Sequence, residues 1–256
     1  MIRNILAIAK NTFRETMRDR IVLAACVIVT LMILFSLFIA SISIDQDIRM
    51  IVDFSITTIY ILQMFVAIFI GSMLIHKEIE RKTFFLLIPK PVKIEEIITG
   101  KCLGLTATTA TVSFLSALGL FAILFFKGSH LFFVPIVVSI LLSIVESSIL
   151  ILLSILFSGM TSPILSAVYT TGFFLIGHSS QIIKTMIIQT TSTAKLFFLT
   201  VAYYLLPNIE KFNTRNDIVY NKIPTPSVLV ITIAYAIGYV LIIFLIAKAI
   251  LKKREL

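Results

Sequence analysis

The run IVLAACVIVTLMILFSLFIASISI, residues 21–44, contains no charged residue and decides the fold class. A helix needs about 20 consecutive apolar residues to cross the roughly 30 Å of hydrocarbon in a bilayer, so this run is long enough to cross once. The basic stretch 1–20 precedes it, and a cleaved signal has an apolar core of only about 7–15 residues. We therefore expect a retained membrane-spanning helix, although Ala40-Ser41-Ile42 is a weak cleavage-like site.

The composition of the whole chain agrees with this expectation. Hydrophobic residues make up 59% and charged residues 14% of the 256 residues, and the mean hydropathy is +1.07. A soluble domain has roughly 45–50% apolar and about 25% charged residues. The composition excludes a water-soluble globule, because such a globule must cover its surface with polar groups.

Further apolar runs predict further crossings. We expect spans at Ile21–Ile44, Phe54–Ile75, Leu103–Phe126, Leu131–Phe157, Pro163–Gly177 and Pro226–Leu251, of which the fifth is the shortest. Neither an internal repeat nor a low-complexity segment divides the chain. The sequence therefore predicts an all-α membrane protein with about six transmembrane helices, built as a single domain over residues 1–256.

The charges between the apolar runs predict the orientation. Lys and Arg gather in residues 1–20, in residues 76–101 and after the last run, whereas the loops after the first and third runs hold few of them. Because cytoplasmic loops carry the excess of Lys and Arg, we expect a multi-pass protein of the inner (plasma) membrane with both termini in the cytoplasm. Topology thus accounts for the formal charge of +9, and we predict no nucleic-acid partner.

Residues 1–20 predict an amphipathic helix at the membrane surface. Their apolar side chains recur at three- and four-residue steps, and cationic side chains flank this stripe. The stripe is Ile2, Ile5, Leu6, Ala9, Phe13 and Met17, and the flanking cations are Lys10, Arg14 and Arg18. Such a helix lies among lipid headgroups, where it serves either as a topology anchor or also as a contact for a cytoplasmic partner.

Residues 178–225 form a long segment of mixed polarity before the last span. We predict a re-entrant or interfacial pair of helices on the outer side, because such backbone is tolerated at membrane depth when protein buries it. The alternative is a seventh span over residues 190–206. A seventh span would place the basic C-terminal tail outside, against the charge rule.

The segment HKEIERKTFFLLIPKPVKIEEIITGK, residues 76–101, lies between the second and third spans. Charged residues 78–82 are followed at once by the apolar residues 83–88, and two prolines then end the helix. Lys93–Ile98 reads as a second short helix, and Gly100 permits a tight turn into the third span. The first helix either presses into a groove of a cytoplasmic protein or dips its phenylalanines into the membrane interface.

This order of residues resembles the permease subunits of type 2 ABC exporters, and more loosely those associated with nitrous-oxide-reductase maturation. In that family a cytoplasmic coupling helix reads acidic-x-acidic-x-x-Gly-Thr, then Leu-rich, then Pro, then Gly-Lys before the third span. The matching residues are Glu78, Glu80, Thr83, Leu86, Leu87, Pro89, Gly100 and Lys101. Lys82 stands where the family commonly has Gly. Residues 9–20, 158–163, 177–178 and 206–213 are similar to other stretches of the family.

The resemblance implies a function and a set of partners. It implies a permease that forms a translocation pathway as a dimer, with a second copy or a similar chain, above two cytoplasmic ABC ATPase subunits that bind ATP-Mg. It also implies export, although the sequence does not name the cargo. The residues expected to contact the ATPase are Glu78, Glu80, Arg81, Thr83, Phe84, Phe85 and Leu87. This chain lacks the GxxxxGK[ST] loop, so we predict that it holds no cofactor and is not itself an enzyme.

Glu146 stands inside the fourth apolar run. A charged side chain at a helix centre costs about 2.5–3.5 kcal/mol on insertion scales for Asp, Lys or Arg, so we expect Glu146 to face protein or water. It is either a pathway or dimer-interface residue, or a neutral carboxyl bonded to a neighbouring helix. His76, His130 and His178 show neither an HExxH motif nor close spacing to a carboxylate, so we predict no metal site.

Two other functional classes stay open. An intramembrane protease or lipid-modifying enzyme would need a nucleophile–base pair or a metal cluster, and the candidates, Glu146 with His130 or His178, have no recognisable spacing. A non-transporting membrane assembly subunit would show the same spans. A transport assay, or an ATPase encoded beside this chain, separates that class from a transporter.

Overall fold

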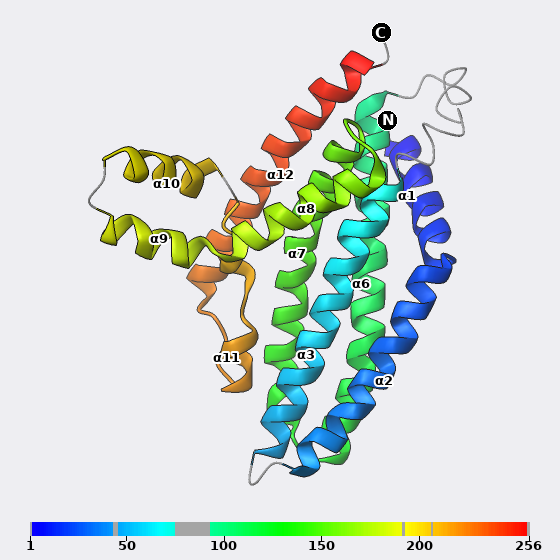
Figure 1. Cartoon of the computed structure of the whole chain (residues 1–256). Helices are drawn as coiled ribbons and strands as arrows, with labels where there is room; N and C mark the ends of the chain where they lie inside the picture. Colours follow the sequence, from blue (N-terminus) through cyan, green and yellow to red (C-terminus); the bar gives the residue numbers. More distant parts are fainter. Residues whose placement is uncertain (1, 43–45, 75–92, 191–192, 206, 255–256) are drawn as a thin grey trace.

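The computed structural model describes residues 2–42, 46–74, 93–190, 193–205 and 207–254. Across these ranges the chain forms helices joined by turns, with no strand (Figure 1). The prediction of an all-α protein is confirmed for this part of the chain.

Within the described ranges, five helices are long and apolar enough to cross a bilayer. They are α2 (Arg20–Ile42), α3 (Asp47–Phe65), which continues to Leu74 through the π-helix η1 (Val66–Ile70), α6 (Ile94–Phe126), α7 (Phe133–Ser158), preceded by the 3-10 turn η2 (His130–Phe132), and α12 (Pro226–Arg254). These five helices fit a multi-pass membrane protein, as predicted.

The fifth predicted span forms a helix but a short one. α8 (Pro163–His178) begins with Pro163 at its first turn, and the Ser162 hydroxyl accepts a hydrogen bond from the Leu165 amide at its N-terminus. Its 16 residues measure about 24 Å, less than the roughly 30 Å of hydrocarbon. By length, the described chain therefore supplies five of the six predicted spans.

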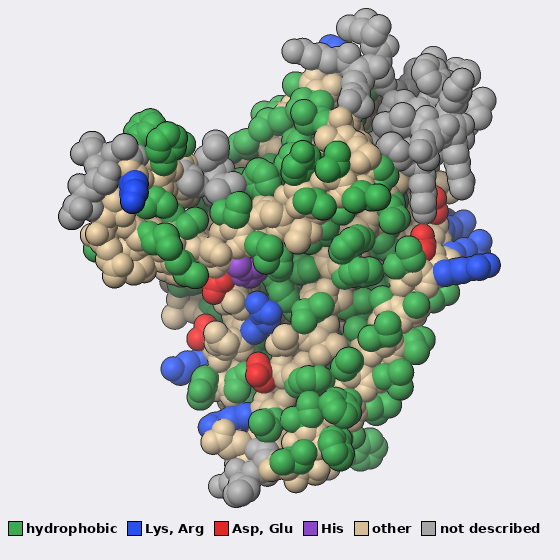
Figure 2. Space-filling model, viewed as in Figure 1, with side chains coloured by type: hydrophobic (Ala, Val, Ile, Leu, Met, Phe, Trp, Pro, Cys, Tyr) green, Lys and Arg blue, Asp and Glu red, His purple; other side chains and the backbone are tan. Residues whose placement is uncertain are grey.

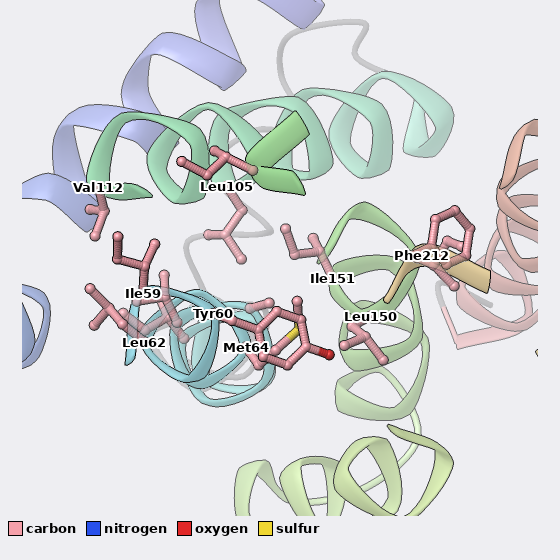
Figure 3. Packing of buried hydrophobic residues seen from close by; sticks show 14 of the residues in the cluster. Ile59, Tyr60, Leu62, Met64, Leu105, Val112, Leu150, Ile151 and Phe212 are labelled. Carbon is pink, nitrogen blue, oxygen red and sulfur yellow. The ribbon is translucent and has the colours of Figure 1, made fainter. Parts of the chain in front are cut away.

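The core of the bundle lies where α7 contacts α3, α6, α8 and α12. Leu105 of α6, Ile59 of α3, and Leu150 and Ile151 of α7 are almost fully buried there. Figure 3 shows Leu105 and Ile151 directed toward the space between α3, α6 and α7, and Ile59 beside Val112 where α3 faces α6. In lipid such contacts stabilise the bundle through close van der Waals packing, because the tails are as apolar as the side chains.

α1 (Ile2–Met17) packs lengthwise against the first turns of α6. Two glycines of α6 permit the close approach. A Cβ on Gly104 would lie 2.6 Å from the Ala9 carbonyl oxygen, and one on Gly100 would lie 2.7 Å from the Ile8 Cβ. The buried face of α1 thus differs from the predicted stripe, because Thr12 and Thr16 are buried while Ile2 and Leu6 stay exposed.

The separate short helix predicted at Lys93–Ile98 is wrong. Residues 94–98 are the first turns of α6, and Gly100 lies inside that helix. The glycine serves close packing against α1 and does not form a turn. Hydropathy marked only the part of α6 that matches the bilayer, and the polar first turns extend the same helix.

The segment between α8 and α12 contains α9 (Ser180–Gln189), α10 (Thr193–Leu205), the 3-10 turn η3 (Ile209–Phe212) and α11 (Arg215–Val219). α9 and α10 contact each other and project from one side of the bundle, whereas η3 and α11 pack back against it (Figure 1). The 13 residues of α10 span about 20 Å, too short for a seventh crossing. The segment thus contains helices, as predicted, and α9 and α10 are its two longest.

Candidate functional site

The predicted ATPase-contact residues lie outside the described residues. They are Glu78, Glu80, Arg81, Thr83, Phe84, Phe85 and Leu87, all within residues 75–92. The remaining predicted site residue, Glu146, is described in full, and the candidate site is built around it.

Glu146 occupies the polar face of α7. Ser139, Ser143 and Ser147 share this face because they recur at three- and four-residue steps, and the face turns toward α3. The Glu146 side chain is 1% exposed, and the Tyr60 hydroxyl of α3 donates a hydrogen bond of 2.5 Å to its Oε1. Glu146 therefore faces protein, as expected, and is bonded to a neighbouring helix.

His178, the last residue of α8, lies between two carboxylates. Its Nε2 is 2.6 Å from the Tyr60 hydroxyl oxygen and 3.3 Å from Glu146 Oε1. Its Nδ1 is 2.8 Å from Oε2 of Glu210, which belongs to η3. The imidazole thus joins α3, α7, α8 and η3 at one point.

Gly177 allows η3 to approach the end of α8. A Cβ at this position would lie 2.6 Å from Ile209 Cγ1 and 2.7 Å from the Pro207 carbonyl oxygen. Any larger residue would push the chain around Ile209 away from α8. The missing side chain at Gly177 is what places Glu210 within hydrogen-bonding distance of His178.

An arginine completes the cluster. The Arg215 guanidinium of α11 lies 3.9 Å from the centre of the Tyr60 ring, within the range of a cation–π contact. Arg215 Nε donates to Asn213 Oδ1 at 3.0 Å, and Asn213 Nδ2 donates to Glu210 Oε1 at 2.9 Å. Figure 2 shows charged side chains gathered on the bundle face beneath α9, on a surface that is otherwise largely hydrophobic.

Further polar contacts beside this cluster join α7 to both α3 and α6. Ser143 of α7 donates to Gln63 Oε1 of α3 at 2.8 Å, and the hydroxyl oxygens of Ser147 of α7 and Thr109 of α6 are 3.3 Å apart. Further along, Ser158 donates to the Ser72 carbonyl at 2.7 Å. Polar side chains between helices in lipid contribute about 0.6 kcal/mol each on average, so these contacts fix the alignment of α7 with α3 and α6 more than they add stability.

The sequence analysis named His178 as one of two histidines that could pair with Glu146, without deciding between His178 and His130, and it missed the contact of His178 with Glu210. His178 is 32 residues from both Glu146 and Glu210, so no short motif could show the pairing, and Tyr60, Glu210, Asn213 and Arg215 were not singled out. His130 is not part of the cluster, since its ring packs against Phe125 and Phe133. The available signal was the position of Glu146 inside an apolar run, where a carboxylate needs a polar partner.

The geometry of the cluster favours proton exchange over other chemistry. The two imidazole nitrogens point at separate carboxylates and do not converge on a common point, and no group of three His, Cys, Asp or Glu side chains among the described residues is arranged to hold a metal ion. The tyrosine hydroxyl, the imidazole and the carboxylates are all groups that give and take protons.

Comparisons with known proteins leave the family open. No protein-family model matches the chain, and no curated protein matches it either. The function must therefore be inferred from the chain's own residues and from the resemblance noted for residues 76–101.

Proposed function

We propose that this chain is the permease subunit of a type 2 ABC exporter in the inner membrane. It forms a translocation pathway with a second permease chain and is coupled to separate cytoplasmic ATPase subunits. In this proposal both termini and residues 76–101 face the cytoplasm, α8 is the short fifth span, and α9 and α10 are the outer helix pair.

The observation that supports this proposal is the close packing of α1 on α6. The 33 residues of α6 measure about 50 Å, far more than the roughly 30 Å of hydrocarbon, so part of α6 extends beyond the bilayer. α1 packs on these first turns of α6, directly after the segment that resembles a coupling helix. A movement imposed on residues 76–92 would thus reach the bundle through a stiff two-helix unit.

A third helix meets this unit at the same end. Lys248 of α12 lies 2.7 Å from Glu95 of α6, and Figure 1 shows the start of α1, the start of α6 and the end of α12 at one end of the bundle. Because both side chains are substantially exposed, this ion pair adds little stability. The glycine-mediated contact of α1 with α6 is therefore the element that would transmit a rigid-body movement.

The test is a double substitution in the predicted coupling helix. Phe84→Asp with Phe85→Asp should leave membrane insertion intact but abolish co-purification with a co-expressed ABC ATPase, because charged side chains cannot fill an apolar groove. Phe197→Asp with Phe198→Asp is the matched control, since it makes the same two changes at adjacent phenylalanines that are exposed on α10. Normal ATPase binding by the Phe84/Phe85 variant, or equal loss in both variants, would contradict the proposal.

An intramembrane enzyme is the second candidate, and the contact of Glu146 with His178 favours it. Among the contacts described for this cluster, no serine or cysteine lies against the imidazole, so a nucleophile would have to come from the substrate or from water. A Glu146→Ala variant that keeps full function would remove the main support for this candidate. A non-transporting assembly subunit is separated from both by ATP-dependent transport in reconstituted vesicles.

A further inference from the structure

The cluster around His178 contains three short contacts, and each needs a hydrogen of its own. They join Tyr60 to Glu146 at 2.5 Å, Tyr60 to His178 Nε2 at 2.6 Å, and His178 Nδ1 to Glu210 at 2.8 Å. The tyrosine hydroxyl supplies one hydrogen and a neutral imidazole supplies one more, whereas ionised carboxylates supply none. Two hydrogens cannot fill three contacts, so the geometry requires one further proton.

The added proton completes the network from any of three groups. On the imidazole, both nitrogens donate, and Tyr60 accepts from Nε2 and donates to Glu146. On Glu146, the carboxyl donates to Tyr60, which donates to Nε2, while Nδ1 donates to Glu210. On Glu210, the carboxyl donates to Nδ1, Nε2 donates to Tyr60, and Tyr60 donates to Glu146. Because the three groups are this closely coupled, the proton belongs to the cluster as a whole.

The charges around the imidazole lead to the same conclusion. The groups that face it are Tyr60 from α3, Glu146 from α7, Glu210 from η3 and, across the tyrosine ring, Arg215 from α11. Two carboxylates, one guanidinium and one added proton leave no net charge. Without that proton a negative charge remains uncompensated beside a carboxylate that is 1% exposed, and such a charge is strongly destabilising.

Loss of the proton should act on the contact between His178 and Glu210. One of the three contacts would then bring two acceptor atoms together without a hydrogen between them, and their lone pairs would repel. The Glu210 side chain is 29% exposed whereas that of Glu146 is 1% exposed, so Glu210 is the carboxylate that can turn toward water. That contact joins α8 to η3, and through η3 to α11 and the start of α12.

We propose that Tyr60, Glu146, His178 and Glu210 form a proton-binding site that fastens the segment 207–225 to α7 and α8. The proton enters from water at the exposed side of Glu210 and returns to water there. When it leaves, the segment loosens from the bundle. This inference does not rest on the proposed transporter function, since the site is defined by its own geometry and can be tested without transport.

The test measures access to α11 as a function of pH. In a background with Cys26→Ser and Cys102→Ser, Ile218→Cys reports on a position that is 1% exposed, and Asn216→Cys reports on an exposed position of the same helix. Maleimide labelling is followed in detergent from pH about 5 to about 9, because histidine ordinarily titrates near 6.5. The rate at residue 218 is divided by the rate at 216, which removes the pH dependence of the reagent.

Two substitutions supply the matched comparison. Glu210→Gln places an amide hydrogen on His178 Nδ1, and Glu146→Gln places one on the Tyr60 hydroxyl oxygen, so each fills the third contact without an added proton. With native residues at the site, the labelling ratio should rise several-fold as the pH increases. Both glutamine variants should keep a low ratio throughout. A flat ratio with the native residues, or the same rise in Glu210→Gln, would overturn the proposal.

Thermal unfolding gives a second readout that needs no introduced cysteine. A proton held by the folded site and released on unfolding stabilises the fold at low pH, and this stabilisation is lost as the pH rises. The unfolding midpoint of the native chain should therefore fall more steeply with pH than that of Glu210→Gln. Parallel curves for the two proteins would also contradict a proton-binding site.

Discussion

Glycines admit both α1 to the side of α6 and η3 to the end of α8, but the second contact adds an imidazole held by carboxylates, whereas the first adds a hydrogen bond from Asn4 to Glu96. At the first contact the glycines of α6 bring a neighbouring carbonyl oxygen within 2.6 Å of where a Cβ would stand. At the second, an imidazole lies between two carboxylates. A close-packed contact responds to volume, and an ionisable contact responds to protons. The α1–α6 contact is therefore suited to transmitting a movement, and the η3–α8 contact to opening and closing with the pH.

The largest expected loss of stability follows from removing His178, which joins Glu146 to Glu210. His178→Ala leaves Glu146 and Glu210 without their shared partner, and removing one member of a buried charged group costs about 3–5 kcal/mol. Denaturant titration in detergent should show a fall of this size in the free energy of unfolding. His130→Ala is the matched control, because that ring packs only against phenylalanines in the described contacts. Equal losses in the two variants would show that the contacts of His178 add no stability.

A single added methyl group at Gly104 should disrupt the close packing of α1 on α6. Gly104→Ala forces α1 away from α6, and overpacking of this kind costs about 1–3 kcal/mol. Gly119 lies on the same helix with no atom within 4 Å of an added Cβ, so Gly119→Ala should be neutral or slightly stabilising, since alanine favours helix by about 1 kcal/mol. Limited proteolysis of α1 and the free energy of unfolding both report the difference. If both alanines behaved alike, close packing would not hold α1 in place.

A smaller effect should distinguish the half-buried Arg215 from the exposed Arg49. Arg215→Gln removes a guanidinium that lies 3.9 Å from the Tyr60 ring centre, and a partly desolvated cation–π contact contributes about 0.5–2 kcal/mol. Arg49→Gln removes a similar contact to Tyr220 at 5.6 Å, where both side chains are exposed. The first variant should lose stability measurably and the second should not. The reverse order would argue against a charge-balanced cluster.

Hydropathy predicted the apolar part of the long helices and missed their polar ends. α2 and α12 lie close to the predicted runs, but α3 begins at Asp47 where Phe54 was expected, and α6 begins at Ile94 where Leu103 was expected. An apolar run marks the hydrocarbon thickness, whereas a helix continues through polar residues until its hydrogen bonding ends. The glycine contacts show why these polar ends matter, since α1 packs on such an end of α6.

The candidate site could be predicted only in part. Glu146 could be identified from the sequence, because a carboxylate inside an apolar run is costly and needs a polar partner. His178 was one of two candidate partners, but the choice between it and His130 could not be made from spacing, and Tyr60 and Glu210 could not be predicted, because the three residues come from three other elements that only the fold brings together. Gly177 allows η3 to approach α8 and so brings Glu210 to His178. A single glycine in an apolar run does not predict such a contact.

The most direct test determines on which side of the membrane the predicted coupling segment and α11 lie. In the background without native cysteines, Lys90→Cys places a thiol in the predicted coupling segment, and Asn216→Cys places one on α11. A membrane-impermeant maleimide applied to intact cells should label residue 216 at once and residue 90 only after the membrane is permeabilised. Labelling of residue 90 in intact cells would contradict the topology, and with it the ATPase partner.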